Sequence, residues 1–220
     1  MRILFLILVF LHFAAPSSAS PWPRTEGEVF TSTSFVLPDD GPTATSFAME
    51  YGLTDNTTLS GKVYLPGGNA HSGTASIAAQ YTITKIADVH PVSIGLGVSA
   101  GIMQNAGSFM VESVEITPGI SVGRGFEIAH FAGWATAGAD FHVELPTGQN
   151  IAAMTSTIGL HVSERTMFFI NLEGQIGAEH TDYSISSNYV YDLFESTSVQ
   201  LHSTTGSGPS EVGISFWSIR

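Results

Sequence analysis

Apolar and polar residues alternate along most of the chain beyond its first twenty residues. Between residues 92 and 102, every even position is apolar and every odd position is glycine or serine. The same two-residue period runs through residues 75–84 and 168–176. A period of two indicates a β-strand, and runs of about ten residues match a tilted membrane-spanning strand better than the roughly 5–6 residues usual in soluble proteins. The pattern therefore predicts an all-β protein built from long strands.

Two kinds of turn separate these strands. Segments rich in Gly, Pro and Asn begin near residues 38, 66, 104, 146 and 204, whereas short polar turns lie near residues 54, 163 and 194. The count of strands is about twelve, and single-chain bacterial outer-membrane barrels have an even number. We therefore expect an antiparallel up-and-down transmembrane β-barrel. Its short turns would face the periplasm, and its Gly- and Pro-rich loops would face outward.

Composition favours a membrane barrel over a soluble β-protein. Charged residues are 12% of the chain, against about 25% in soluble domains, and there is no cysteine. The alternative is a soluble secreted β-sandwich or lipocalin-like barrel, with an apolar interior and a polar exterior. Periodicity alone leaves open which face points outward, and the low charge favours an apolar outside. A formal net charge of −12 excludes nucleic acid as an expected partner.

The first residues predict export. Arg2 precedes an apolar run over residues 3–13, and small residues follow, with Ser17 and Ala19 in an A-x-A-like arrangement. The apolar run is shorter than the roughly 20 residues of a spanning helix. We expect a signal peptide at residues 1–19 that is cleaved after Ala19, a barrel domain at residues 20–220, and localisation in a Gram-negative outer membrane.

Two segments near the start of the predicted barrel resemble a known family. Residues 26–30 read EGEVF, and residues 50–59 read EYGLTDNTTL. They resemble a group of poorly characterised proteobacterial outer-membrane β-barrels with an EYGLTDRLTL-like hairpin, similar to transporter-type barrels linked to phenol degradation. The resemblance implies a membrane barrel, but its motif is a turn and does not specify a substrate. Such barrels commonly end in an aromatic residue that the outer-membrane assembly machinery reads, and Phe216 and Ile219 are the candidates for that signal here.

If the apolar face contacts membrane lipid, the polar face lines the lumen. Twelve polar or ionisable residues are then candidates for the lumen wall: Glu50, Lys62, Gln80, Glu115, Asp140, His142, Glu144, His161, Asn171, Glu173, Asp192 and His202. Their surplus of carboxylates would favour cations or neutral polar solutes over anions. The sequence therefore predicts a passive pore or channel for small solutes. The alternative is a non-conducting structural or surface-interaction barrel, in which inward charges only pair with one another.

A lumenal enzyme is a third hypothesis. Asp140, His142 and Glu144 share one strand face with about 7 Å between successive members, a spacing that suits acid–base chemistry or a metal. Alternation produces such triplets wherever a strand faces water, so they are weak evidence for a site. Outer-membrane phospholipases place Ser, His and Asn on the outer wall, and no matching serine motif accompanies the histidines here. We therefore expect no enzymatic activity, no cofactor and no bound metal.

Overall fold

The computed structural model describes residues 22–67, 72–83, 91–105, 108–145, 147–178 and 181–220. The predicted signal peptide lies outside the described residues. The described chain forms twelve strands. Their bounds are β1 Val29–Pro38, β2 Ala44–Thr54, β3 Thr57–Leu65, β4 Ser72–Ile83, β5 Val92–Asn105, β6 Ser108–Ile128, β7 Phe131–Glu144, β8 Asn150–Ser163, β9 Thr166–Ile176, β10 Thr181–Phe194, β11 Thr197–Gly206 and β12 Glu211–Ile219.

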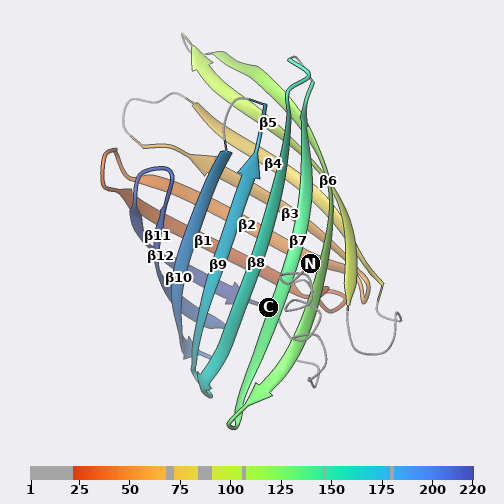
Figure 1. The fold of residues 1–220 in the computed structure, drawn as a ribbon, viewed down its shortest axis with the longest axis vertical. Coiled ribbons are helices and arrows are strands. Elements are labelled where there is room, and N and C mark those ends of the chain that lie inside the picture. The colour runs from red at the N-terminus through yellow and green to blue at the C-terminus, as the bar shows by residue number, and fades with distance from the viewer. Residues whose placement is uncertain (1–21, 68–71, 84–90, 106–107, 146, 179–180) are drawn as a thin grey trace.

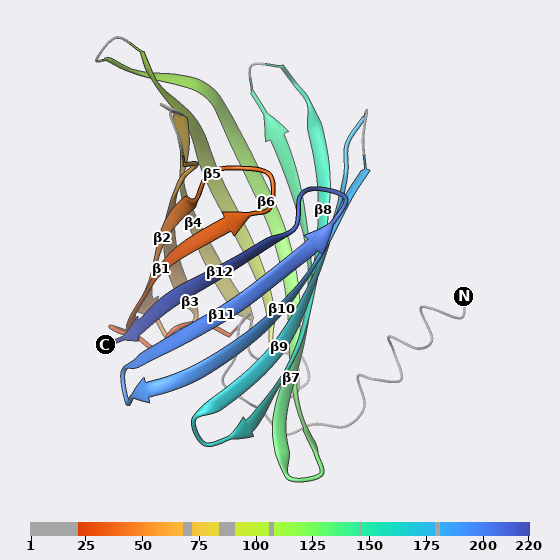
Figure 2. The same ribbon diagram turned by 90° about the vertical axis from the view of Figure 1, so that its left-hand side faces the viewer.

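The strands form one closed antiparallel barrel. Each strand pairs with its neighbours in sequence, and β1 closes the barrel against β12 from Phe30 opposite Ile219 to Pro38 opposite Glu211. Figures 1 and 2 show the tilted strands wrapping around a single lumen. The prediction of an up-and-down barrel of about twelve strands is confirmed. Among the described residues, no helix is long and apolar enough to cross a membrane.

The outer surface of the barrel is apolar. Ile77 on β4 is 70% exposed and Leu96 on β5 is 56% exposed. On the opposite face of the same two strands, the hydroxyls of Thr82 and Ser93 are buried and lie 2.8 Å apart. This is the reverse of a soluble barrel, which packs apolar side chains inside. The expected orientation, apolar outward and polar inward, is therefore the observed one.

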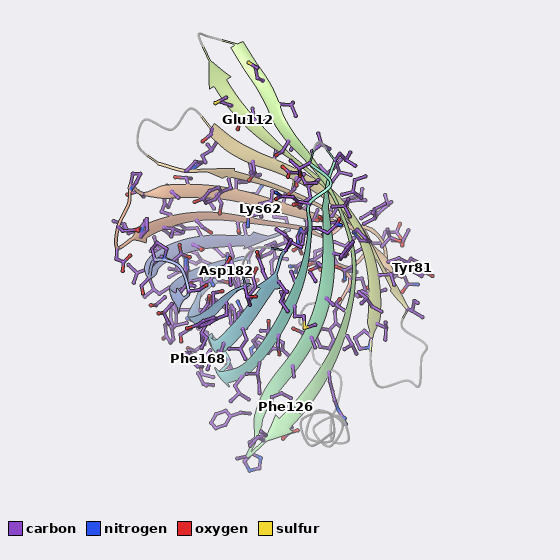
Figure 3. The ribbon with its side chains drawn as sticks, turned by 45° about the horizontal axis from the view of Figure 1, so that its top comes forward. Lys62, Tyr81, Glu112, Phe126, Phe168 and Asp182 are labelled. Carbon is purple, nitrogen blue, oxygen red and sulfur yellow. The ribbon has the colours of Figure 1, made fainter. Side chains whose placement is uncertain are left out.

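Exposed aromatic side chains form a ring near each end of the barrel. The ring beside the short turns contains Tyr51, Tyr81, Phe168, Tyr191 and Phe216. The ring near the other end contains Phe35, Phe47, Phe141 and Tyr183. Tyr81 projects from the outer surface in Figure 3. Transmembrane barrels carry such aromatic girdles at the two membrane interfaces, with an apolar band between them.

The short turns lie together at one end, with the C-terminus (Figure 2). The predicted turns near residues 54, 163 and 194 connect β2 to β3, β8 to β9, and β10 to β11. A further tight turn, not predicted, joins β6 to β7 through Ala129 and His130, which have φ angles of 49° and 76°. Positive φ is uncommon outside Gly and Asn, so this turn lacks the residues by which such turns are recognised.

Candidate functional site

The register places the twelve predicted lumen residues on the inward face. Lys62, for example, pairs with Ser76, Ser76 pairs with Ser99, and Ser99 pairs with Glu115, so that these residues share one face of the wall. By the same alternation the inward face holds Glu50, Gln80, Asp140, His142, Glu144, His161, Asn171, Glu173, Asp192 and His202. That they line a path for solutes remains a prediction.

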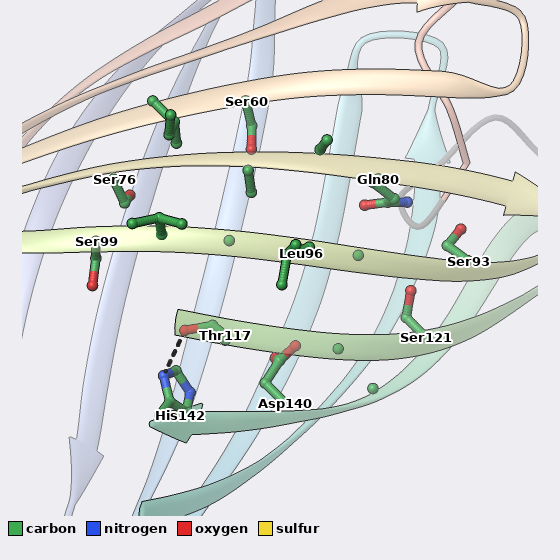
Figure 4. A pocket seen from close by; sticks show the side chains of 18 of the residues that line it. Ser60, Ser76, Gln80, Ser93, Leu96, Ser99, Thr117, Ser121, Asp140 and His142 are labelled. Atoms are coloured by element: carbon green, nitrogen blue, oxygen red, sulfur yellow. Dashed lines mark hydrogen bonds between the residues drawn. The ribbon is translucent and has the colours of Figure 1, made fainter. Parts of the chain in front are cut away.

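Part of this inward face is hollowed into a cavity lined by polar, glycine and apolar residues. The cavity is about 440 Å³ and lies along the wall from β3 to β8 (Figure 4). Small residues set its depth, because Gly95, Gly97, Gly119 and Gly138 line it where other positions carry side chains. Its rim is supplied by serine and threonine hydroxyls together with the predicted residues Gln80, Glu115, Asp140 and His142.

Glu115 and His142 form a hydrogen-bonded pair at one side of the cavity. The Nδ1 atom of His142 lies 2.8 Å from Oε1 of Glu115. Thr117 lies beside both, with its hydroxyl 3.1 Å from the same carboxylate oxygen and 3.3 Å from the imidazole. Ser99 donates a longer hydrogen bond of 3.4 Å to that oxygen. The Glu115 carboxylate is thus held in place by the wall.

Asp140 differs from Glu115 in its surroundings. Its carboxylate lies over Gly119, so close that a Cβ at position 119 would overlap it. His142 and Glu173 are its charged neighbours. Among the described residues it accepts no hydrogen bond, and in Figure 4 the carboxylate stands free in the cavity. This half-buried acceptor is available to a solute.

An aromatic layer fills another part of the lumen, toward the end with the short turns. Trp134 of β7 contacts Phe169 of β9 with ring centroids 6.0 Å apart, and Phe169 lies 6.5 Å from Trp217 of β12. Phe30 of β1 completes the row, 5.7 Å from Trp217. Two strands, β10 and β11, separate β9 from β12 in the wall, so Phe169 and Trp217 meet by reaching across the interior. Val190 on β10 is 0% exposed. The lumen is therefore apolar and filled on this side, and polar and hollow on the other.

The residues that precede β1 fold back into the mouth of the barrel. Arg24 hydrogen-bonds Glu50 at 2.7 Å and Glu28 at 3.2 Å, and its guanidinium lies 4.4 Å from the ring centroid of Phe30. Its backbone N–H donates to the Thr58 hydroxyl at 2.9 Å. The sequence pattern assigns these residues to the barrel domain and predicts no lumen contact for them. No local signal marks Arg24 as a lumen residue, because its contacts depend on the chain reversing at Gly27, where φ is 82°.

Several other predicted residues are tied to the wall. Asn171 accepts a hydrogen bond from Thr157, Asp192 accepts one from Ser198, and Glu144 accepts one from Thr147 in the loop beyond β7. Two predicted histidines pack on neighbours: the His161 ring lies 5.4 Å from Trp134, and the His202 ring covers Gly213.

Lys62 and the Asp140–His142–Glu144 triplet do not form the interactions that a joint site would need. Lys62 is exposed and forms no ion pair with a described residue. The triplet does not converge, because His142 turns to Glu115 and Glu144 turns to Thr147. Within the described ranges, no group of three or more His, Asp or Glu side chains is placed to hold a metal ion.

The likeness of the chain to known proteins is one of structure. No family model matches it, and no curated protein matches it in sequence. Among solved structures it is similar to a KdgM porin in complex with disordered oligogalacturonate, with TM-score 0.68, 10% identity, and 86% of this chain and 98% of that chain covered. It is also similar to the COG4313 outer membrane channel from Pseudomonas putida F1, with TM-score 0.56, 9% identity, and 93% of this chain and 100% of that chain covered. The NanC porin is similar with TM-score 0.61, 8% identity, and 87% of this chain and 98% of that chain covered.

These likenesses are to proteins described as porins or channels. At such low identity they establish the architecture, and they do not confirm the family suggested by the hairpin at residues 50–59. The chain is an all-β, closed, twelve-stranded antiparallel barrel with the fold of small outer-membrane porins.

Proposed function

We propose that the chain is a passive outer-membrane pore for small polar solutes. The observation that carries the proposal is a cavity lined by many polar side chains inside a closed barrel whose outer surface is apolar between two aromatic rings. An apolar outside suits lipid, and a hydrated polar inside suits passage. We propose that residues 1–19 direct export, that the assembly machinery inserts residues 20–220, and that the short turns face the periplasm.

The charge of the lumen supports a preference for cationic or neutral solutes. Among the described inward-facing residues there are two cations, Arg24 and Lys62, and Arg24 is engaged by Glu28 and Glu50. Further inward carboxylates include Glu115, Asp140, Glu144, Glu173 and Asp192. Rings of carboxylates favour cations in pores. A polyanion such as the oligogalacturonate in the KdgM complex would meet net repulsion here.

The enzyme hypothesis has less support. The inward histidines are bound to a carboxylate or packed on an aromatic ring or a glycine, and the Asp140–His142–Glu144 triplet does not converge. A non-conducting barrel is the second candidate. It is favoured by the contact between Phe169 and Trp217, which bridges part of the lumen.

Single-channel conductance of the refolded mature chain in a planar bilayer separates the two candidates. We expect discrete steps with a cation preference. Glu173→Gln removes an inward negative charge and should weaken that preference, whereas Lys62→Gln removes an inward positive charge and should strengthen it. A silent bilayer, with insertion verified by heat-modifiable gel mobility, would favour the non-conducting barrel.

A further inference from the structure

We propose that the cavity on the β3–β8 wall is a binding site for a small hydroxylated solute that carries an amine, such as an amino sugar, and that Asp140 receives the amine. The inference deepens the proposed function and rests on it, since the solute must be able to enter the lumen.

The cavity has the size and shape of a site for a small molecule. Its volume of about 440 Å³ lies within the roughly 300–1,000 Å³ of ligand pockets. Its depth comes from Gly95 and Gly97 on β5, and Gly119 on the adjacent strand β6 leaves room for the Asp140 carboxylate that lies over it. A Cβ at Gly95 would lie 3.6 Å from the backbone oxygen of Ala79, an ordinary van der Waals contact, so a side chain would fit there and its absence leaves the recess. The wall is therefore hollow on this side, while aromatic rings fill the lumen elsewhere.

Asp140 is a hydrogen-bond acceptor in the cavity that no described residue of the protein engages. Glu115 is engaged by His142, Thr117 and Ser99, whereas the Asp140 carboxylate has no hydrogen-bond donor among the described residues. Figure 4 shows Asp140 between Thr117 and Ser121, and its carboxylate lies over Gly119 of β6. An ionised carboxylate only accepts hydrogen bonds, so its natural partner is a cationic or hydroxyl donor.

Hydroxyl groups line the cavity that holds this carboxylate. Ser76, Ser99, Ser121 and Thr155 line the same cavity. Each hydroxyl both donates and accepts, which matches the hydroxyls of a sugar-like solute in any orientation. No lysine or arginine is among the residues that line the cavity, and the His142 imidazole is already bonded to Glu115, so an anionic solute would find no unengaged partner for its charge. The arrangement therefore favours solutes that donate hydrogen bonds and carry a positive charge.

Three sugars with the same ring but different charge test the assignment: glucosamine, glucose and glucuronate. Calorimetric titration into the refolded barrel in detergent, in mildly acidic buffer, should show glucosamine binding roughly tenfold more tightly than glucose, the factor that one charge-assisted hydrogen bond supplies. Glucuronate should bind most weakly. Asp140→Asn should remove the preference for glucosamine. Asp192→Asn is the matched control, because Asp192 also faces inward but is bonded to Ser198 and does not line the cavity.

A second pair of variants tests the geometry without removing a charge. Gly119→Ala must displace the Asp140 carboxylate and should weaken glucosamine binding, whereas Gly61→Ala, where the nearest atom is 3.8 Å away on the outward face, should not. Equal affinity for glucuronate and glucosamine, or an unchanged preference in Asp140→Asn, would overturn the assignment. The same sugars added to a planar bilayer separate the two proposals. Conductance without selective binding refutes the site alone, whereas selective binding by a folded barrel that does not conduct refutes the pore alone.

Discussion

At the scale of single residues, Gly159 shows how the aromatic side of the lumen limits substitution. It lies directly opposite Trp134 across β7 and β8, and a Cβ there would overlap the indole ring. Trp134 is 5% exposed and packs on Phe169 and His161, so it has little room to move. We expect Gly159→Ala to lower the free energy of unfolding by about 1–3 kcal/mol, the usual cost of overpacking. Urea unfolding in lipid vesicles, followed by circular dichroism, measures it.

Gly174→Ala is the control for this prediction. Gly174 lies on the outward face of the adjacent strand β9, and the nearest atom to its added Cβ is 4.0 Å away. A methyl group there overlaps no neighbouring atom, so the free energy of unfolding should stay within about 0.5 kcal/mol of that of the parent protein. Equal losses in the two variants would mean that the substitutions act through the backbone and that the contact with Trp134 has no special role.

The sequence could predict the side on which a residue lies, but not its partners. Period-two alternation is enough to place Asp140 and His142 on one face. The bond between His142 and Glu115 needs the register of β6 against β7, which lie antiparallel with a break in their pairing at Thr117 and Pro118. Contacts across the lumen, such as Phe169 with Trp217, depend on barrel closure and leave no periodic signal.

At the scale of elements, the segment before β1 is a candidate latch. Arg24 ties it to Glu50 on β2 with side chains that are 24% and 38% exposed. Because the pair is partly solvated, we expect a coupling energy of about 0.2–1 kcal/mol in a double-mutant cycle of Arg24→Gln and Glu50→Gln. The cycle is measured from the unfolding free energies of the two single variants and the double variant.

Conductance distinguishes a steric latch from a purely electrostatic effect of the same pair. If the segment obstructs the mouth, Arg24→Gln and Glu50→Gln should each raise cation conductance, and the double variant should add little. If only charge matters, the two variants should change cation conductance in opposite directions, because one removes a positive and the other a negative charge. The second result would contradict the latch.

The strands themselves were largely predictable, and the exceptions have physical causes. Apolar and polar or glycine residues alternate without interruption over residues 92–102, because one side of β5 forms part of the apolar outer surface and the other side lines the cavity. The turn at Ala129 and His130 escaped prediction since it contains neither Gly nor Asn. The inward turn of the segment at Arg24 depends on contacts with β2 and β3 that a local pattern does not reveal.

At the scale of the whole molecule, the fold places an apolar surface outside and a polar one inside, and two adjacent residues of β4 test this. Ile77 faces outward near the middle of the strand, and Ser76 faces the cavity. Ile77→Arg should cost about 2–4 kcal/mol of folding free energy in bilayers, the penalty for a cation at the lipid midplane. Ser76→Arg should leave that free energy nearly unchanged, because the lumen is hydrated, and should reduce the cation preference of the current. Urea titration in vesicles and reversal-potential measurements give the two readouts. A larger loss of stability in Ser76→Arg than in Ile77→Arg would contradict the assigned orientation, since the face that tolerates a charge is the one in contact with water.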